Sequence, residues 1–307
     1  MKTVRIHEYG GAERLQYEDA PEPEAGAGEV LVRVRAASVN PVDYKLASGA
    51  YRKGSPPLPW TPGGDFAGII DSVGEDIEGL EIGAEVYGDC RPGGGYAEFV
   101  ATKLEWVAAK PPSLSFVEAA SVPLAAQTAW QGLFDHGQLE KGQRVLIHGA
   151  PGGVGTFAVQ LAHWKGAEVI ATGSVQDEEY LLSLGVDQFI DYKQTKFEDK
   201  VSGLDLVFDL IGGETLERSY GVVRRGGTLI TTVQEPSAEK AAEQGIRAEV
   251  YMMQPSCRNL EHLTRLIEEG VLKPVVAATY PLEQAAEAWR HLQGQHTQGK
   301  IVLEVSR

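Results

Sequence analysis

The stretch from Arg144 to Gly155 constrains the fold of this chain more than any other. Its sequence is Arg-Val-Leu-Ile-His-Gly-Ala-Pro-Gly-Gly-Val-Gly, an apolar run of strand length that leads directly into a glycine-rich turn. From Thr156 onward the apolar residues change to helical spacing. A buried strand, a glycine turn and a helix in this order are typical of a site that binds the pyrophosphate of a dinucleotide.

The glycines of this turn have separate roles in that interpretation. Gly152 lets the backbone approach the pyrophosphate, and Gly155 lets the helix pack closely on the strand. The helix N-terminus adds free N–H groups and a positive dipole end. The common G-x-G-x-x-G pattern is incomplete, because Ala150 occupies its first glycine position. The alternative is a glycine loop with a purely structural role. We predict cofactor contacts from Ala150, Gly152, Gly153, Val154 and Gly155.

Length and composition limit the possible partners. A chain of 307 residues exceeds the usual size of one core, so we expect two domains. The 28 basic and 43 acidic residues give a formal net charge of −15, which argues against nucleic acid or an anionic membrane as the main partner. The two cysteines, Cys90 and Cys257, fit a reducing compartment. No apolar run has the length of a signal peptide or a membrane span, so we expect a cytoplasmic protein.

Strand patterns and helical patterns divide the chain. The first part, punctuated by glycine and proline, predicts a small barrel with strands near residues 29–37, 66–73, 83–88 and 96–100. Helix-length segments then separate strand candidates at residues 144–149, 168–172, 204–210 and 227–232. This alternation predicts an α/β domain with a doubly wound parallel sheet. A helix over residues 282–292 and a strand beginning at residue 300 end the chain.

Five segments carry a resemblance to a known family. They are residues 38–45 (Ser-Val-Asn-Pro-Val-Asp-Tyr-Lys), 62–68 (Pro-Gly-Gly-Asp-Phe-Ala-Gly), 73–75 (Val-Gly-Glu), 150–155 and 299–303 (Gly-Lys-Ile-Val-Leu). Through them the chain resembles the medium-chain dehydrogenase/reductase superfamily, in its zinc-independent quinone oxidoreductase and alkenal reductase branch. The resemblance implies a homodimer, with the cofactor in a cleft between two domains. The implied domains are a GroES-like, partly open β-barrel catalytic domain (residues 1–121 and 268–307) and a Rossmann dinucleotide-binding domain (residues 122–267).

The metal ligands of the zinc members are missing. The resemblance implies that they carry a cysteine where Asn40 stands, a His-Glu pair where Gly64 and Asp65 stand, and a further cysteine near Ala125. Zinc needs thiolate or imidazole ligands, which an amide, a glycine and a methyl group cannot supply. We therefore expect no metal, and oxidation of simple alcohols is not the expected reaction.

We expect hydride transfer from NAD(P)H to a quinone, an enal or an enone, in which conjugation makes a carbon electrophilic. Hydrogen bonds to the carbonyl oxygen would stabilise the developing enolate. The resemblance places Asn40 and Tyr44 near the nicotinamide as substrate-positioning groups, with either Tyr44 or water as the proton donor. The alternatives are that Asn40 caps its own backbone before Pro41 and that Tyr44 is an ordinary packing residue.

Other residues are implied only by the resemblance. Gln127 and Thr128 match the stretch beside the nicotinamide, with a role at a helix start as the alternative. We predict that Thr128 contacts the cofactor. Tyr51 and Tyr251 are weaker candidates for the lining of the same cleft.

The end of the second strand of the α/β domain indicates the cofactor. An acidic residue there would select NAD, but residues 171–174 (Ala-Thr-Gly-Ser) contain no carboxylate. The resemblance places Ser174 and Tyr192 at positions that hydrogen-bond the 2′-phosphate in NADPH-dependent relatives. Gln176 departs from those relatives, which usually have a lysine there, and Lys193 compensates only if its loop brings it close. We expect a modest preference for NADPH, with NADH as the alternative.

Two further functions stay open from the sequence alone. One is a zinc-free dehydrogenase or enoyl reductase that acts on a longer acyl substrate. The other is a cofactor-binding protein with little turnover, which would have no need for Asn40 and Tyr44 beside the nicotinamide.

Overall fold

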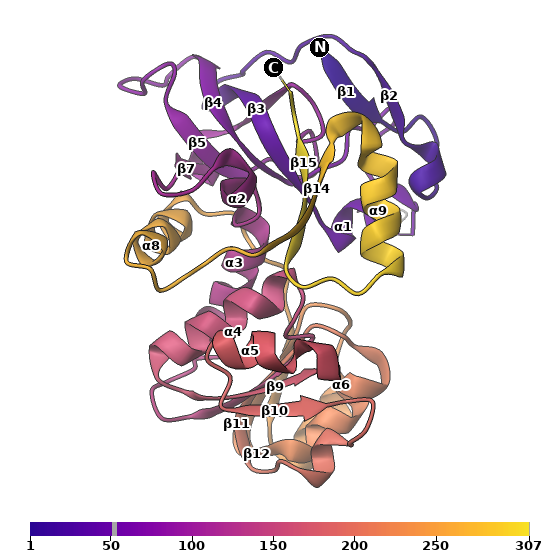
Figure 1. The fold of residues 1–307 in the computed structure, drawn as a ribbon, viewed down its shortest axis with the longest axis vertical. Helices are drawn as coiled ribbons and strands as arrows, with labels where there is room; N and C mark the ends of the chain where they lie inside the picture. The colour runs from indigo at the N-terminus through magenta and orange to yellow at the C-terminus, as the bar shows by residue number, and fades with distance from the viewer. Residues whose placement is uncertain (51–53, 307) are drawn as a thin grey trace. The chain divides into compact units, whose positions relative to one another are not determined.

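The computed structural model describes residues 1–50 and 54–306, and the chain forms two compact units. Unit 1 comprises Met1–Leu124, Pro255–Glu269 and Pro274–Arg307, and unit 2 comprises Ala125–Gln254 and Gly270–Lys273. The first strand, β1, and the last strand, β15, both belong to unit 1 (Figure 1).

Unit 1 is built around a mainly antiparallel sheet. Its strands are β1 (Lys2–Arg5), β2 (Gln16–Asp19), β3 (Glu29–Val39), β4 (Asp65–Val73), β5 (Glu85–Asp89), β6 (Phe99–Lys103), β7 (Val107–Ala109), β14 (Val276–Pro281) and β15 (Lys300–Glu304). The strand order is β14-β15-β3-β4-β5-β7, with β6 also paired to β3 and with β1 and β2 as a separate pair. The helices are α1 (Pro41–Ala47), α2 (Phe116–Ala120), α8 (Cys257–Glu268) and α9 (Ala285–Gly294).

The long strand β3 lies at the centre of unit 1 because its apolar residues alternate. Val30, Val32 and Val34 are at most 2% exposed and pack in one core with Tyr96 and Trp289. Single bridges, Thr3 to Ala97 and Ile6 to Trp60, connect the N-terminal segment to this core. The predicted GroES-like, partly open β-barrel is confirmed.

Unit 2 has a parallel sheet of six strands. They are β8 (Arg144–His148), β9 (Glu168–Gly173), β10 (Gln188–Asp191), β11 (Leu204–Asp209), β12 (Val223–Thr231) and β13 (Arg247–Val250), in the order β10-β9-β8-β11-β12-β13. Its helices are α4 (Gly153–Lys165), α5 (Glu178–Ser183), α6 (Gly213–Ser219) and α7 (Ala238–Gln244), with α3 (Pro123–Trp130) at its start (Figure 1). Numbered along the sheet, this is the 3-2-1-4-5-6 order of doubly wound dinucleotide folds. The predicted Rossmann domain is confirmed.

The two units differ from the predicted domain boundaries at α8. The prediction assigned residues 255–267 to the dinucleotide domain, whereas they belong to unit 1. The Tyr87 hydroxyl donates to the Leu260 carbonyl at 2.9 Å, and it lies 2.8 Å from the Thr264 hydroxyl. These bonds and the buried face of α8, which includes Leu263, attach the helix to the β-barrel.

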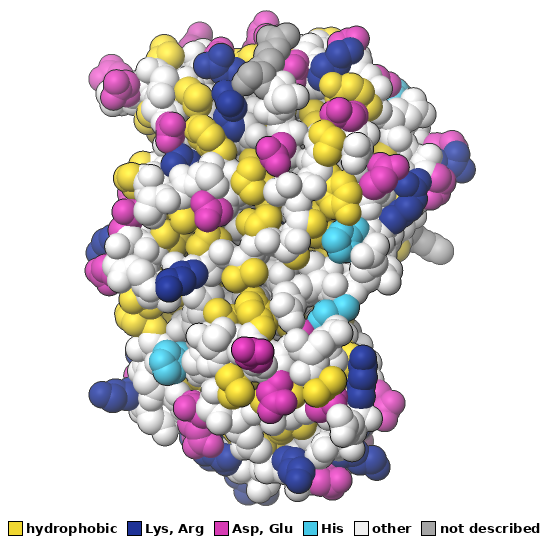
Figure 2. Space-filling model, viewed as in Figure 1, with side chains coloured by type: hydrophobic (Ala, Val, Ile, Leu, Met, Phe, Trp, Pro, Cys, Tyr) yellow, Lys and Arg dark blue, Asp and Glu magenta, His cyan; other side chains and the backbone are white. Residues whose placement is uncertain are grey.

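Charged side chains are dispersed over the surface. On the face drawn in Figure 2, carboxylates and basic groups alternate and do not gather into one patch. Within the described residues, no helix is long and apolar enough to cross a membrane. On this face, the acidic side chains are therefore solvated surface groups and form no single acidic patch.

Candidate active site

The glycine loop begins directly after β8, at the point where the strand order of the sheet reverses. Gly149 has a φ of +75°, in the left-handed region that favours glycine. Ala150 has no positive φ, so its methyl group is tolerated. Gly149 thus supplies the tight turn, one position before Ala150, which occupies the first glycine position of the motif. A glycine directly after a buried strand is the sequence signal that indicates this turn.

Gly152 and Gly155 are glycines for different reasons. A Cβ atom on Gly155 would lie 2.3 Å from the Gly149 carbonyl oxygen and 2.5 Å from that of Ala150, so helix α4 packs too closely on the loop for any side chain. A Cβ atom on Gly152 would meet only the Gly149 oxygen, at 3.4 Å, which is an ordinary contact. The chain itself therefore leaves open the space next to Gly152.

The start of α4 presents backbone donors beside that space. The first bond of the helix runs from the Thr156 N–H to the Gly152 carbonyl, at 2.9 Å. The N–H groups of Gly153, Val154 and Gly155 come before any residue with an intrahelical partner. Free N–H groups beside an unfilled glycine position suit a pyrophosphate. The loop fits the phosphates of a dinucleotide cofactor.

The ends of β9 and β10 bring Ser174 and Tyr192 to one edge of the sheet. The Tyr192 N–H donates to the Gly173 carbonyl at 3.1 Å, and the Tyr192 side chain is 58% exposed. Ser174 is buried, and its hydroxyl donates to the Asp177 carboxylate at 2.8 Å. The Ser174 hydroxyl is thus already hydrogen-bonded to a carboxylate of the chain.

Lys193 lies at the same edge. Its ammonium nitrogen is 5.9 Å from the centre of the Tyr192 ring, a cation–π distance. Among the described residues, no carboxylate forms an ion pair with it. This contact places Lys193 beside its chain neighbour Tyr192, and its compensation for Gln176 stays a prediction.

Thr128 lies within α3 and is 6% exposed. Its carbonyl accepts a hydrogen bond from the Tyr251 hydroxyl, and the Tyr251 ring stacks on His136 with the ring centres 4.4 Å apart. Tyr251 therefore packs inside unit 2. The other weaker candidate, Tyr51, lies outside the described residues.

Asn40 is the N-cap residue of α1 and is 1% exposed, and its side chain makes no capping hydrogen bond to the helix, unlike in the alternative interpretation. Its backbone N–H donates to the Asp43 carboxylate at 2.9 Å. The side chain makes different contacts: Nδ2 donates to Asp65 Oδ2 at 2.9 Å, and Oδ1 accepts from Lys300 Nζ. The Asn40 amide is thus held between two buried charged groups, and its contact with substrate stays a prediction.

Tyr44 is half-buried on α1. Its ring contacts Trp289 edge-on, with the ring centres 6.2 Å apart and the planes at 70°. No residue in the described part of the chain hydrogen-bonds to its hydroxyl. Burial, and to a smaller extent Asp43, raises the pKa of Tyr44, so the phenol is protonated at neutral pH. The ring has the packing role of the alternative interpretation, and the O–H stays available as a donor.

Asp43 lies on the buried side of the same helix. Its Oδ2 atom accepts from the Tyr96 hydroxyl at 2.9 Å as well as from Asn40, and Trp289 Nε1 donates to that hydroxyl oxygen at 3.1 Å. Burial raises the pKa of Asp43 to about 7, against the hydrogen bonds, which lower it. Folding therefore favours protonated Asp43.

The Asp43→Asn variant is expected to remove a pH-dependent loss of stability. Because folding raises the pKa of Asp43 from 3.8 to about 7, the wild type loses stability as the pH rises through this window, by up to about 4 kcal/mol. Asparagine keeps an acceptor for Asn40 and Tyr96 and does not titrate. Urea unfolding from pH 4 to pH 8 measures the difference, with Asp71→Asn, at an exposed position, as the control. Parallel pH profiles of wild type and Asp43→Asn would contradict the raised pKa.

Comparisons with known proteins agree with this geometry. A family model described as alcohol dehydrogenase GroES-like domain matches residues 26–112, and one described as zinc-binding dehydrogenase matches residues 184–303. A 2-methylene-furan-3-one reductase from Solanum lycopersicum is 35% identical over 316 residues, covering 99% of this chain and 79% of that protein. The chain belongs to the medium-chain dehydrogenase/reductase superfamily.

Two more similar proteins place this dehydrogenase/reductase in the quinone and alkenal reductase branch. An NADPH-dependent alkenal/one oxidoreductase, chloroplastic, from Arabidopsis thaliana is 34% identical over 99% of the chain and 79% of that protein. The structure of the quinone oxidoreductase from Coxiella burnetii has a TM-score of 0.95 and 32% identity, over 100% of this chain and 99% of that one.

The residues at the zinc positions of this superfamily do not fit zinc. Asn40 offers an amide that is already hydrogen-bonded, while Gly64 and Ala125 offer no donor atom. Lys300 Nζ lies 3.8 Å from Asp65 Oδ2, so a cation of the chain already faces this carboxylate. Within residues 1–50 and 54–306, no three His, Cys, Asp or Glu side chains form a group that could hold a metal ion.

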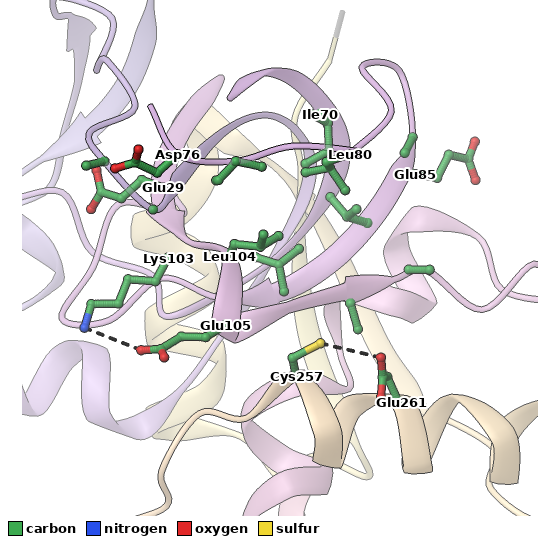
Figure 3. A pocket seen from close by; sticks show the side chains of 18 residues that line it. Glu29, Ile70, Asp76, Leu80, Glu85, Lys103, Leu104, Glu105, Cys257 and Glu261 are labelled. Atoms are coloured by element: carbon green, nitrogen blue, oxygen red, sulfur yellow. Dashed lines mark hydrogen bonds and ion pairs between the residues drawn. The ribbon is translucent and has the colours of Figure 1, made fainter. Parts of the chain in front are cut away.

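A pocket of about 860 Å³ lies elsewhere in unit 1 of this dehydrogenase/reductase (Figure 3). Apolar side chains such as Ile70, Leu80 and Leu104 line it, and none of the predicted site residues does. Cys257 is at its edge, where burial and the neighbouring Glu261 raise the pKa of the thiol. The thiol is therefore a poor nucleophile. This pocket is separate from the predicted site residues.

Proposed function

We propose that this protein reduces quinones or α,β-unsaturated carbonyl compounds by hydride transfer from NADPH. The glycine loop is the observation that supports a dinucleotide cofactor, because the chain leaves the space next to Gly152 open. The similar proteins support the substrate class, because a methylene-furanone, an alkenal or alkenone and a quinone all contain a carbon–carbon double bond conjugated to a carbonyl group. Such a bond accepts hydride without a metal.

NADPH, when bound, supplies the hydride. We propose that the loop from Ala150 to Gly155 holds its pyrophosphate through backbone N–H groups, and that Thr128 contacts it as the resemblance implies. At the other end, Tyr192 and Lys193 would hold the 2′-phosphate. Ser174 would contact the phosphate through its hydroxyl only if the bond to Asp177 were exchanged, so Tyr192 and Lys193 are expected to contribute more.

We propose that Tyr44 and Asn40 act on the substrate. The Tyr44 phenol is protonated and unpaired among the described residues, so it can donate a hydrogen bond to the substrate carbonyl oxygen and then a proton to the enolate. The second N–H of the Asn40 amide has only distant acceptors, Ser38 Oγ at 3.4 Å and Ser38 O at 3.5 Å. It is the donor that Asn40 offers to a substrate oxygen.

An assay with conjugated acceptors tests this function. We expect NADPH oxidation, followed by its absorbance, with quinones, enals and enones and none with saturated aldehydes, in buffer containing EDTA. Tight NADPH binding without turnover of any acceptor would favour a cofactor-binding protein. Turnover that depends on a metal would contradict the proposed chemistry.

The Tyr44→Phe variant is expected to lower kcat/KM for enones by about tenfold, because it removes one donor to the developing oxyanion while it keeps the contact of the ring with Trp289. Steady-state kinetics measures the change. NADPH affinity, measured by fluorescence, is the control and should be unchanged. A loss of NADPH binding with constant kcat would indicate that Tyr44 has no role in the reduction step.

The Lys193→Ala variant is expected to raise KM for NADPH by about fivefold and to leave KM for NADH unchanged, because only NADPH carries the dianionic 2′-phosphate. Lys200→Ala removes another exposed lysine of unit 2 and is the control. Adding Gln176→Lys to Lys193→Ala should restore part of the preference. Equal changes for the two cofactors would exclude Lys193 from the 2′-phosphate site.

We also propose that the enzyme is a cytoplasmic homodimer. The family resemblance supports the dimer, and the two unpaired cysteines, Cys90 and Cys257, fit a reducing compartment. Light scattering on the purified protein measures the oligomeric state.

A further inference from the structure

Lys300 is a buried lysine in the Gly299–Leu303 segment that has no role in the function proposed above. It is 5% exposed and begins β15, which pairs with the end of β3. Gly299 has a φ of +88°, and a Cβ atom there would lie 2.3 Å from the Val275 carbonyl oxygen. Only glycine fits this turn, and the turn delivers the lysine side chain to the core of unit 1.

The lysine ammonium group contacts the residue predicted to position the substrate. Nζ donates to Asn40 Oδ1 and, at 3.2 Å, to the Val39 carbonyl. On the other side of the amide, Asp65 Oδ2 accepts from Asn40 Nδ2 at 2.9 Å and from Ser38 Oγ at 2.6 Å. The Asn40 side chain is thus held at both of its polar ends.

These two neighbours fix the direction of the amide. An ammonium group only donates hydrogen bonds, so the atom that faces Lys300 must be the amide oxygen. Asp65 accepts hydrogen bonds from Ser38 Oγ and the Leu124 N–H, so the amide group that faces it must be an N–H. Rotating the amide by 180° would lose both bonds. The second N–H of Asn40, whose acceptors on Ser38 lie 3.4 and 3.5 Å from Nδ2, therefore has one orientation.

The carboxylate of Asp65 and the ammonium group of Lys300 compensate each other's burial. Burial lowers the pKa of Lys300, and the carboxylates of Asp65 and Asp43 oppose this effect. The Asp65 side chain is fully buried, with Lys300 Nζ at 3.8 Å and the Leu124 N–H at 2.7 Å. Methionine in place of Lys300 would leave this carboxylate without its cation and the Asn40 oxygen without its donor.

We propose that Lys300 is a positioning residue for the reduction: with Asp65 it holds the Asn40 side-chain amide in the single orientation that presents its second N–H, which has only long contacts to Ser38, to the substrate oxygen. This rests on the proposed function of Asn40. Lys300 does not contact substrate itself, and its effect on the reaction passes through Asn40.

A double-mutant cycle in the full-length protein tests this coupling. Lys300→Met and Asn40→Ala are each expected to lower kcat for an enone by about tenfold, and the double variant should be no more than about twofold slower than Asn40→Ala alone. The Kd for NADPH should stay within about twofold of wild type. Lys103→Met, which removes an exposed lysine of unit 1, is the control. If kcat of the double variant fell by about 100-fold, the two losses would be independent and the proposal would be overturned.

A second measurement does not depend on turnover. Asn40 and Asn259 are the only asparagines of the chain, so labelling with ¹⁵N-asparagine gives two side-chain amide signals in an NMR spectrum. We expect slow hydrogen exchange for the Asn40 amide in the wild type and exchange about tenfold faster or more in Lys300→Met, with Asn259 unchanged. An unchanged Asn40 signal would overturn the proposal even if the enzyme is active.

The failures of the two proposals can be told apart. A wild type that does not reduce conjugated acceptors contradicts the proposed function, while the NMR measurement still decides whether Lys300 orients Asn40. If Lys300→Met fails to fold, Lys300→Met combined with Asp65→Asn removes both charges together. If that pair recovers the wild-type kcat, Lys300 serves only to balance Asp65, and the positioning role is overturned.

Discussion

Replacing Gly152 with alanine is expected to leave the unliganded protein folded and to weaken NADPH binding by about 100-fold or more. The methyl group would lie 3.4 Å from the Gly149 carbonyl oxygen, so the chain accommodates it without moving. The same methyl group would occupy the space in which the backbone approaches the pyrophosphate. Fluorescence titration with NADPH and the Tm without cofactor give the two quantities.

Gly155→Ala provides the matched comparison. Its Cβ atom would lie 2.3 Å from the Gly149 carbonyl oxygen, so the helix or the loop must shift and the Tm without cofactor should fall. Gly152→Ala should therefore separate binding from stability, and Gly155→Ala should lower both. NADPH affinity at the wild-type level in Gly152→Ala would place the pyrophosphate away from this loop.

Replacing Asp65 with alanine is expected to lower the free energy of unfolding by about 3–5 kcal/mol, because it removes one partner of a buried ion pair and leaves the other charge without compensation. Asp65 is fully buried and accepts hydrogen bonds from Ser38, Asn40 and Leu124. Without Asp65, Lys300 loses the carboxylate at 3.8 Å that opposes the effect of burial on its pKa. Urea unfolding measures the loss.

Asp65→Asn and Asp71→Asn serve as comparisons. Asparagine at position 65 keeps an acceptor of the same shape, so a smaller loss is expected than for alanine. Asp71 is exposed, and its substitution should change the free energy of unfolding by less than about 0.5 kcal/mol. A loss for Asp65→Ala as small as that for Asp71→Asn would mean that the ion pair contributes little to the fold.

The sequence predicted those elements whose pattern is local and strong. Val145, Leu146 and Ile147 form a buried strand as expected. The strands β10 and β13, of four residues each, were not predicted. Such short segments become strands because they pair with a neighbour already in the sheet, and that pairing has no local signal.

The assignment of α8 shows the same limit at the level of domains. Its apolar spacing predicts a helix with one buried face, but the spacing does not say which core covers that face. The Tyr87 hydroxyl and strand β7 of the barrel cover it in the structure, although Tyr87 is 173 residues away from Leu260. Amphipathic periodicity therefore predicts burial and leaves the partner open.

The sequence alone determined the dinucleotide loop, because strand, turn and helix follow one another there and each glycine acts on atoms within a few residues of itself. Only the tertiary structure decided the surroundings of Asn40. Its partners Asp65 and Lys300 are 25 and 260 residues away, and they meet it because β3 pairs with both β4 and β15. A local pattern reports on forces that act between neighbours along the chain, whereas a buried cluster of charges depends on strand pairing across the whole sheet.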